Sequence, residues 1–365
     1  MPQSTEMTLE FEDNVSSDRA PLRSFSYSSP PLFDRGLIKA LLYIDCALTF
    51  VGLLALSFED QLWQIVLSQS VCVGLGSGLV FVPAVAMAAS TFIAWQPIAR
   101  GIASTGSAVG GTVLPLGFQA LISKLGTAWT NRIFSFVTLA TSALAILTLG
   151  WETTTSARAR QSSTLFLDIS AFRGPSYLFL CAGLFLVELV FWIQDFLIAP
   201  YAQFALSSSS QYVFYLLAIL NAGYPAGRIL PAFVAQMPKI GPAWTLFAGS
   251  AILGILVFCW IAIDDVIAIT VWAVLVGFTS GIAVSIPKTV VPKLSAPKNV
   301  DTRSGTLWTT VAFAALIGAP IAGMMVDTED GSYKGGQMFG GAIICAGSIL
   351  LCVPASKMER GAHRE

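Results

Sequence analysis

Four ionisable side chains lie inside long apolar segments of this sequence: Asp45, Glu188, Asp195 and Arg228. A charge near the centre of a bilayer is costly unless it is paired or hydrated, so such residues are typical of binding sites and ion pathways. Arginine holds a carboxylate through two parallel hydrogen bonds, and a carboxyl group removed from water binds a proton more readily. We therefore expect Arg228 to bind an anion and the three acids to be candidate carriers of a coupling proton. The alternative is that these groups pair structurally or reach the membrane surface.

The depth of these residues favours Glu188 among the acids. It lies 11 residues into its apolar segment, which is about 16 Å along a helix and near the middle of a bilayer. Asp195 follows on nearly the same helical face but nearer the end of the segment. Arg228 lies in the next segment, and Asp45 lies at intermediate depth in the first.

Composition predicts an integral membrane protein with many spans. The 365 residues are 55% hydrophobic and only 11% charged, with a mean hydropathy of +0.73, whereas about 25% of residues are charged in a soluble domain. The net charge of −1 gives no indication of nucleic-acid binding. The single histidine, His363, lies near the C-terminus, and the six cysteines lie in apolar runs without metal-ligand spacing. We therefore expect no metal, no cofactor and no enzyme activity.

Segments long enough to cross a bilayer, roughly 20 residues each, divide the chain into five parts. A polar tail, 1–34, precedes a partial helix bundle of four spans over 35–150. A linker, 151–176, leads to a six-span bundle over 177–356 and a short tail, 357–365. Lysine and arginine gather in the tails, the linker and alternate loops, which predicts that both termini and the linker are cytoplasmic. The ten predicted spans are 37–57, 62–90, 101–123, 133–150, 177–203, 211–235, 243–263, 266–287, 304–326 and 335–356.

A short repeat links the two bundles. Residues 73–78 (VGLGSG) and 276–281 (VGFTSG) both follow an acidic loop and precede a proline, at an offset of 203 residues. The same offset carries Arg100 onto Arg303. Many transporters consist of internal repeats with weak residual similarity, so the repeat predicts a duplicated membrane unit.

Glycines spaced along one helix face let a neighbouring backbone approach closely. We expect such helix-packing or gating surfaces at seven positions: Gly74, Gly78, Gly106, Gly110, Gly111, Gly277 and Gly281. Tight packing in a static bundle is the alternative interpretation of the same glycines.

Several blocks resemble the monocarboxylate porter-like branch of the major facilitator superfamily, and its fungal members in particular. Residues 74–83 (GLGSGLVFVP) and 99–111 (ARGIASTGSAVGG) are similar to the fourth and fifth helices of that family. Residues 167–173 (LDISAFR) resemble the end of its central loop, 217–231 (LAILNAGYPAGRILP) its eighth helix, and 317–323 (IGAPIAG) its eleventh. The resemblance extends over residues 37–356.

The resemblance implies an all-α polytopic membrane protein, a major-facilitator-type bundle of about ten helices in a four-plus-six arrangement. It implies a solute site at Arg228, Tyr224 and Asn221. Animal members have an aspartate where this chain has Tyr224, so Glu188 becomes the substitute proton carrier, with Asp195 and Asp45 as further candidates. The first two helices of a twelve-span fold are expected to be lacking, because one span precedes the first glycine block.

The expected function is secondary transport of a small organic anion or metabolite by alternating access, with or without proton coupling. The partners are then the solute, protons and the lipid bilayer. Two alternatives stay open, a metabolite efflux pump and a non-transporting, sensor-like relative of such a porter. The expected location is the plasma membrane, with an internal membrane as the alternative.

Overall fold

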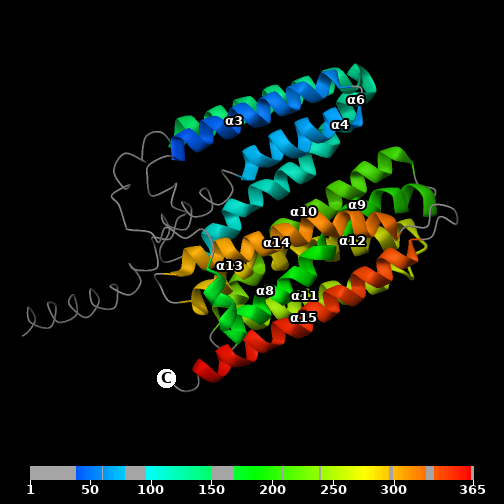
Figure 1. The fold of residues 1–365 in the computed structure, drawn as a ribbon. Helices are drawn as coiled ribbons and strands as arrows, with labels where there is room; N and C mark the ends of the chain where they lie inside the picture. The colour runs from blue at the N-terminus through cyan, green and yellow to red at the C-terminus, as the bar shows by residue number, and fades with distance from the viewer. Residues whose placement is uncertain are drawn as a thin grey trace, which may run out of the picture.

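The computed structural model describes residues 38–59, 61–78, 96–149, 168–206, 209–237, 240–295, 299–325 and 333–362. Throughout these segments the regular structure is helical, and they contain no β-strand. The helices form two groups, with α3, α4 and α6 on one side and α8 to α15 on the other (Figure 1). The all-α membrane fold predicted from the sequence is thus confirmed.

The first group is a small bundle in which α6 forms a hairpin. Helix α3 (Ile38–Ala55) and a short 3-10 turn (Leu56–Phe58) lead to α4 (Leu62–Ile65), a π-helical stretch (Val66–Val73) and helix through Gly78. Helix α6 (Gln96–Leu149) breaks at Gly126, whose φ of 74° lies in the left-handed region that favours glycine. The two arms pack together through Phe118 and Phe134, with ring centroids 5.8 Å apart.

The second group begins with the turn η4 (Ile169–Arg173), α8 (Pro175–Phe191), α9 (Ile193–Pro200) and a π-helical turn (Tyr201–Ala205). It continues with α10 (Ser210–Gln236), α11 (Gly241–Trp260), α12 (Val266–Ser285), α13 (Pro287–Lys293), α14 (Val300–Met324) and α15 (Lys334–Ala362). Its core consists of large apolar side chains that water does not reach, among them Leu180, Leu184, Phe191, Leu216, Leu253, Trp260 and Ile269. Helix α15 extends six residues beyond the predicted span end at 356, and the end of the predicted linker is already ordered as η4.

The offset of 203 residues also relates helices of the two groups. It places α3 (Ile38–Ala55) on residues 241–258, which lie within α11, and it places Leu62 at the start of α4 on residue 265, next to the start of α12 at Val266. The packing is similar, since the ring centroid of Phe50 on α3 lies 5.7 Å from that of Phe136 on the second arm of α6, and α11 lies against α15, to which that arm corresponds. These correspondences support the duplicated membrane unit predicted from the repeat.

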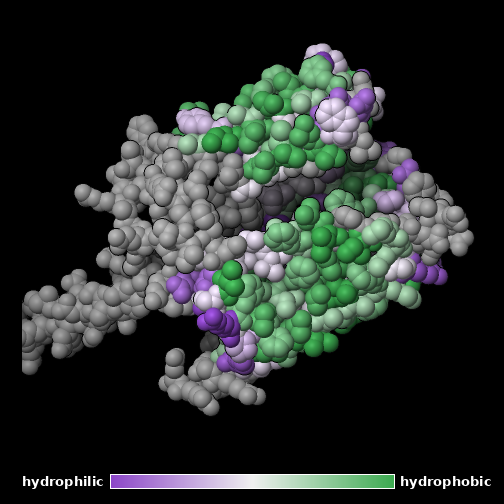
Figure 2. Space-filling model, in the orientation of Figure 1, coloured by the Kyte–Doolittle hydropathy of each residue, from purple (hydrophilic) through white to green (hydrophobic). Residues whose placement is uncertain are grey.

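Six segments of the described chain are long and apolar enough to cross a membrane: Thr105–Thr148, Pro175–Gln203, Gln211–Gln236, Gly241–Trp260, Val266–Lys293 and Lys334–Met358. Thr105–Thr148 combines two of the ten predicted spans, which meet at the Gly126 break. The predicted span 304–326 corresponds to α14, and the span 37–57 corresponds to the shorter apolar helix Leu42–Phe58. The predicted tail 1–34 and residues 79–90 of the second predicted span lie outside the described residues. Apolar side chains cover much of the visible surface (Figure 2).

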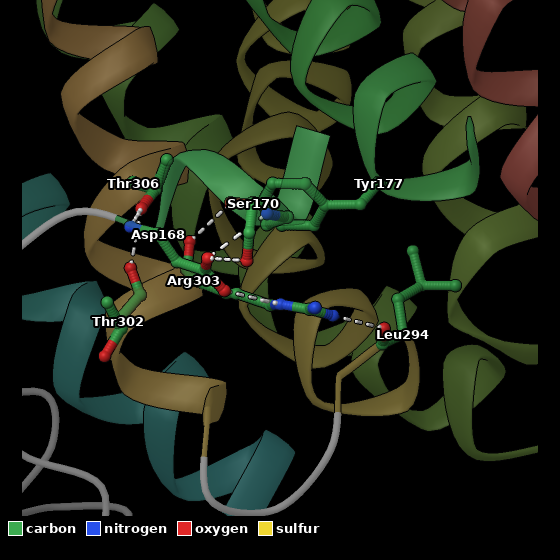
Figure 3. A network of polar contacts seen from close by, with 8 residues as sticks. Asp168, Ser170, Tyr177, Leu294, Thr302, Arg303 and Thr306 are labelled. Atoms are coloured by element: carbon green, nitrogen blue, oxygen red, sulfur yellow. Dashed lines mark hydrogen bonds and ion pairs between the residues drawn. The ribbon is translucent and has the colours of Figure 1, made fainter. Parts of the chain in front are cut away.

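A polar network holds the end of the linker against α13 and α14 (Figure 3). The Asp168 carboxylate accepts hydrogen bonds from Ser170 Oγ and from Arg303 Nε, the latter at 3.2 Å. Arg303 Nη1 donates to the carbonyl of Leu294 at 3.1 Å, and Tyr177 Oη donates to the carbonyl of Arg303 at 2.6 Å. Hydrogen bonds from Ser170 and Arg303 hold the pKa of Asp168 below its ordinary value.

This network predicts a loss of stability in acid. A carboxyl group whose pKa is lower in the folded state stabilises that state above its unfolded pKa, and the contribution disappears as pH falls through the folded pKa. We expect Asp168→Asn to cost about 1 kcal/mol at pH 7, because the Arg303 ion pair is lost. Thermal unfolding in detergent between pH 7 and pH 3 checks this: the deficit must shrink as pH falls below about 4.

The matched control is Asp265→Asn, at the start of α12. Asp265 caps that helix by accepting hydrogen bonds from the backbone of Ile267 and Ala268, and asparagine caps a helix about as well as aspartate. This variant is expected to behave like the wild type. An Asp168→Asn deficit that stays constant with pH would contradict the role of the charge.

Candidate functional site

Three of the predicted site residues form a chain of contacts in the second half. Arg228 on α10 is only 8% exposed, and its guanidinium carbon lies 5.4 Å from the centre of the Tyr224 ring, one turn earlier. A guanidinium over an aromatic face is held by a cation–π attraction. Tyr224 Oη donates in turn to the carboxylate of Asp195 on α9, at 3.2 and 3.4 Å. An acid, a phenol and a guanidinium are thereby connected within one group.

Two further polar residues join this chain, and the sequence analysis did not single them out. Ser280 of α12 interacts electrostatically with Tyr224. Gln194 of α9 donates from Nε2 to Ser280 Oγ at 3.0 Å, and both side chains are buried. Ser280 belongs to the second glycine block, where the sequence drew attention to the glycines alone. The connected polar side chains therefore come from three helices, α9, α10 and α12.

Glycine contacts bring α10 and α12 close enough to form this group. A Cβ added at Gly227 would overlap the carbonyl oxygen of Phe278, and one added at Gly277 would overlap that of Leu220. At Gly281, an added Cβ would lie 2.7 Å from the carbonyl oxygen of Tyr224. Two helix backbones can approach so closely only where small residues line the crossing. The predicted packing glycines Gly277 and Gly281 lie at this crossing.

Arg228 also contacts the first half of the molecule. Its Nη1 donates to Ser107 Oγ, on the first arm of α6, at 2.7 Å. One turn further along α6, an added Cβ at Gly111 would overlap the side chain of Asn221, a predicted solute-binding residue. Helices α6 and α10 form the main boundary between the halves, and a recess is visible between the two groups in Figure 2. Arg228 and Asn221 therefore lie where the two halves meet.

The structure places the other two predicted acids outside this chain of contacts. Glu188 on α8 is 4% exposed and interacts electrostatically with Lys288 of α13. Asp45 on α3 accepts a hydrogen bond from Thr49 at 3.0 Å, within its own helix. Of the three candidate proton carriers, Asp195 is thus the one in contact with the group around Arg228.

The remaining predicted packing glycines have open surroundings in the part of the chain that is described. An added Cβ at Gly74, Gly78 or Gly106 would meet no atom within 4 Å, and at Gly110 it would meet only Leu114 of the same helix. The close approach in the first block occurs instead at Gly76, where an added Cβ would lie 2.8 Å from Thr49 Oγ1. Among the described residues, no group of three or more His, Cys, Asp or Glu side chains could hold a metal ion.

Comparison with known proteins identifies the family. The model of the Major Facilitator Superfamily matches residues 31–319. The chain belongs to the Major Facilitator Superfamily. It is therefore a multi-pass integral membrane protein of a transporter superfamily and not an enzyme, and the superfamily level of the sequence-based resemblance is confirmed.

The relatives in sequence include fungal members of the superfamily. The aspyridones efflux protein of Emericella nidulans is 31% identical over 322 residues, which cover 88% of this chain and 64% of that protein. The agnestins efflux protein of Paecilomyces divaricatus is 27% identical, over 96% of this chain and 80% of that protein. An MFS-type transporter of Ophiocordyceps sp. is 30% identical, over 88% of this chain and 71% of that protein. The chain thus spans about two thirds to four fifths of the length of these relatives.

Solved structures of transporters share the fold. The fucose:proton symporter FucP of E. coli superposes with a TM-score of 0.65 at 13% sequence identity, over 92% of this chain and 90% of that one. A bacterial homologue of the iron transporter ferroportin, in an outward-facing state, gives a TM-score of 0.58 at 11% sequence identity. The superposition covers 92% of this chain and 85% of that one. At these identities the likeness establishes the architecture alone.

Proposed function

We propose that this protein is a secondary transporter that carries a small organic anion across the membrane by alternating access. The observation that carries the proposal is the position of Arg228, a buried cation where the two halves of the fold meet. A buried charge is costly and is retained where it pairs with a partner or a ligand. Major facilitator proteins carry solutes near the boundary between their repeats, so an anionic solute fits this position.

The binding group is a guanidinium fork, in contact with an aromatic ring and beside an amide. Arg228 can bind a carboxylate through two parallel hydrogen bonds. Tyr224 supports the guanidinium from one side, and Asn221 lies two turns away on the same helix. We propose these three residues as the solute-contacting set, with a monocarboxylate-like group as the part of the solute that Arg228 recognises.

Export of a metabolite is the favoured direction of transport. Two of the relatives are named as efflux proteins, for aspyridones and for agnestins. Those names describe the relatives, and we extend only the direction to this chain, with the plasma membrane as its location. Within the superfamily we propose the monocarboxylate porter-like branch, in which α3, α4 and the two arms of α6 correspond to the third to sixth helices. The 203-residue offset between the two glycine blocks supports this numbering.

Proton coupling through Asp195 is part of the proposal, with Glu188 as the second candidate. Asp195 reaches Arg228 through Tyr224, so its charge can respond to an anion bound there. Asp195→Asn keeps a hydrogen-bond acceptor for Tyr224 but removes the titrating group. We expect this variant to lose solute accumulation driven by a pH gradient and to retain solute exchange at equal concentrations. Parallel measurements in proteoliposomes, with Asp265→Asn as control, check this; unchanged accumulation would exclude Asp195 as the carrier.

Transport itself is tested with the purified full chain in proteoliposomes. Flux of labelled lactate, pyruvate and benzoate is measured with and without a pH gradient, against liposomes without protein. Saturable flux of at least one of these carboxylates is the expected result. Its absence for all three would contradict the proposal and favour a non-transporting, sensor-like role.

A further inference from the structure

Arg228 forms a hydrogen bond to a residue that belongs to the opposite half. Its Nη1 donates to Ser107 Oγ at 2.7 Å, and Ser107 lies on the first arm of α6 while Arg228 lies on α10. A second contact between the same two helices joins Gly111 and Asn221. Gly111 lies one turn after Ser107 on α6, and Asn221 lies two turns before Arg228 on α10. The hydrogen bond is thus part of a continuous antiparallel contact between the two halves.

We propose that Ser107 is a positioning residue for the anion site, whose hydroxyl holds the guanidinium of Arg228 in the orientation that binds the solute. This inference rests on the proposed function. Arginine has many rotamers, and fixing the side chain before the solute arrives removes an ordering cost from binding. The Tyr224 ring restrains the plane of the guanidinium, and the bond to Ser107 restrains its rotation within that plane.

Ser107 does not compete with the solute for the whole guanidinium. The group carries five N–H donors in a planar fork, and the bond to Ser107 engages one nitrogen, Nη1. A carboxylate bound in the two-bond arrangement takes two of these donors. The hydroxyl therefore acts on solute affinity through the orientation of Arg228.

The position of Ser107 also couples affinity to conformation. The bond from Arg228 forms only while the first arm of α6 lies against α10, so movement of one half relative to the other breaks it. A solute then binds more tightly in the arrangement seen here than in one where the halves have separated at this boundary. Such a difference in affinity between two states is what allows a ligand to shift the equilibrium between them.

The test compares Ser107→Ala with Ser107→Thr in the full chain in proteoliposomes, with labelled lactate, pyruvate or benzoate as the probe. We expect Ser107→Ala to raise KM by about fivefold or more, because one hydrogen bond to a charged group is lost, and to change the maximal flux by less than about twofold. Ser107→Thr retains the hydroxyl and is expected to restore the wild-type KM. Ser123→Ala is the matched control, since Ser123 lies on the same arm and its hydroxyl donates to Ala120 of its own helix.

A double variant shows whether Ser107 acts through Arg228. In an Arg228→Ala background, Ser107→Ala is expected to leave KM unchanged. A wild-type KM for Ser107→Ala, or an equal further rise in the double variant, would overturn the inference. Should Ser107→Ala fail to fold, Ser107→Cys, a weaker acceptor, must still give a KM above that of Ser107→Thr.

Failure of the inference and failure of the proposed function give different results. If Arg228→Ala raises KM while Ser107→Ala does not, only the positioning role of Ser107 is wrong. If Arg228→Ala has a wild-type KM, or if no probe is carried at all, the anion site itself is wrong and the role of Ser107 is wrong with it.

Discussion

Arg228→Ala is expected to raise the KM for a transported carboxylate by at least about 30-fold, equivalent to about 2 kcal/mol of binding free energy. Among the connected side chains of Arg228, Tyr224 and Asp195, only the guanidinium carries a positive charge that attracts an anion. Its removal leaves the solute carboxylate without a positive partner beside the buried ring of Tyr224. Initial rates of labelled flux at several solute concentrations measure this change.

Two further variants show whether the effect belongs to the guanidinium of Arg228. Arg228→Lys tests the planar fork, and Arg173→Ala is the control for removal of an arginine elsewhere. Lysine keeps the charge but not the planar fork, so Arg228→Lys should fall between the wild type and Arg228→Ala. Arg173 is exposed in η4, and Arg173→Ala should transport normally. Equal KM values for Arg228→Ala and Arg173→Ala would remove Arg228 from the solute site.

Gly227→Ala is expected to have the largest effect on stability. An added Cβ would overlap the carbonyl oxygen of Phe278, and backbone on a crossing helix cannot rotate away as a side chain can. Overpacking a tight contact costs about 1–3 kcal/mol and sometimes more, and we expect a value at or above the upper end. The separation of α10 and α12 would also displace Arg228, which follows Gly227 in the chain.

Gly106→Ala is the matched control, because this glycine is also helical but an added Cβ meets no described atom within 4 Å. Alanine in an open helical position stabilises by about 0.5–1 kcal/mol relative to glycine. The thermal unfolding temperature in detergent should therefore fall for Gly227→Ala and hold or rise for Gly106→Ala. Equal shifts in the two variants would contradict the assigned helix crossing.

The sequence predicted the fold well because the signals involved are local or repeated. Apolar length and composition identify membrane helices, and the glycine blocks revealed the 203-residue offset that also relates α3 to α11 and the start of α4 to that of α12. Individual packing positions were harder to predict. In the first block the close approach involves Gly76 and not Gly74 or Gly78, since the direction in which a helix faces depends on its neighbours and not on glycine spacing alone.

The candidate site was predictable in its charged members only. Arg228 and Asp195 stand out in the sequence because charges are rare in apolar segments. Ser107, Gln194 and Ser280 do not, because a single hydroxyl or amide in a membrane helix commonly bonds within its own helix. Their roles depend on which helices meet, and Ser107 lies 121 residues from its partner Arg228. Such a contact is determined by how the halves dock.

The most direct test of the anion site compares a carboxylate with its neutral primary amide. The carboxylate with the highest flux is labelled, and its uptake is inhibited by the unlabelled acid or by the amide, in the wild type and in Arg228→Ala. The account predicts that the acid inhibits the wild type at least about 30-fold more strongly than the amide and that this preference is lost in Arg228→Ala. Equal inhibition by acid and amide in the wild type would contradict an anion site at Arg228.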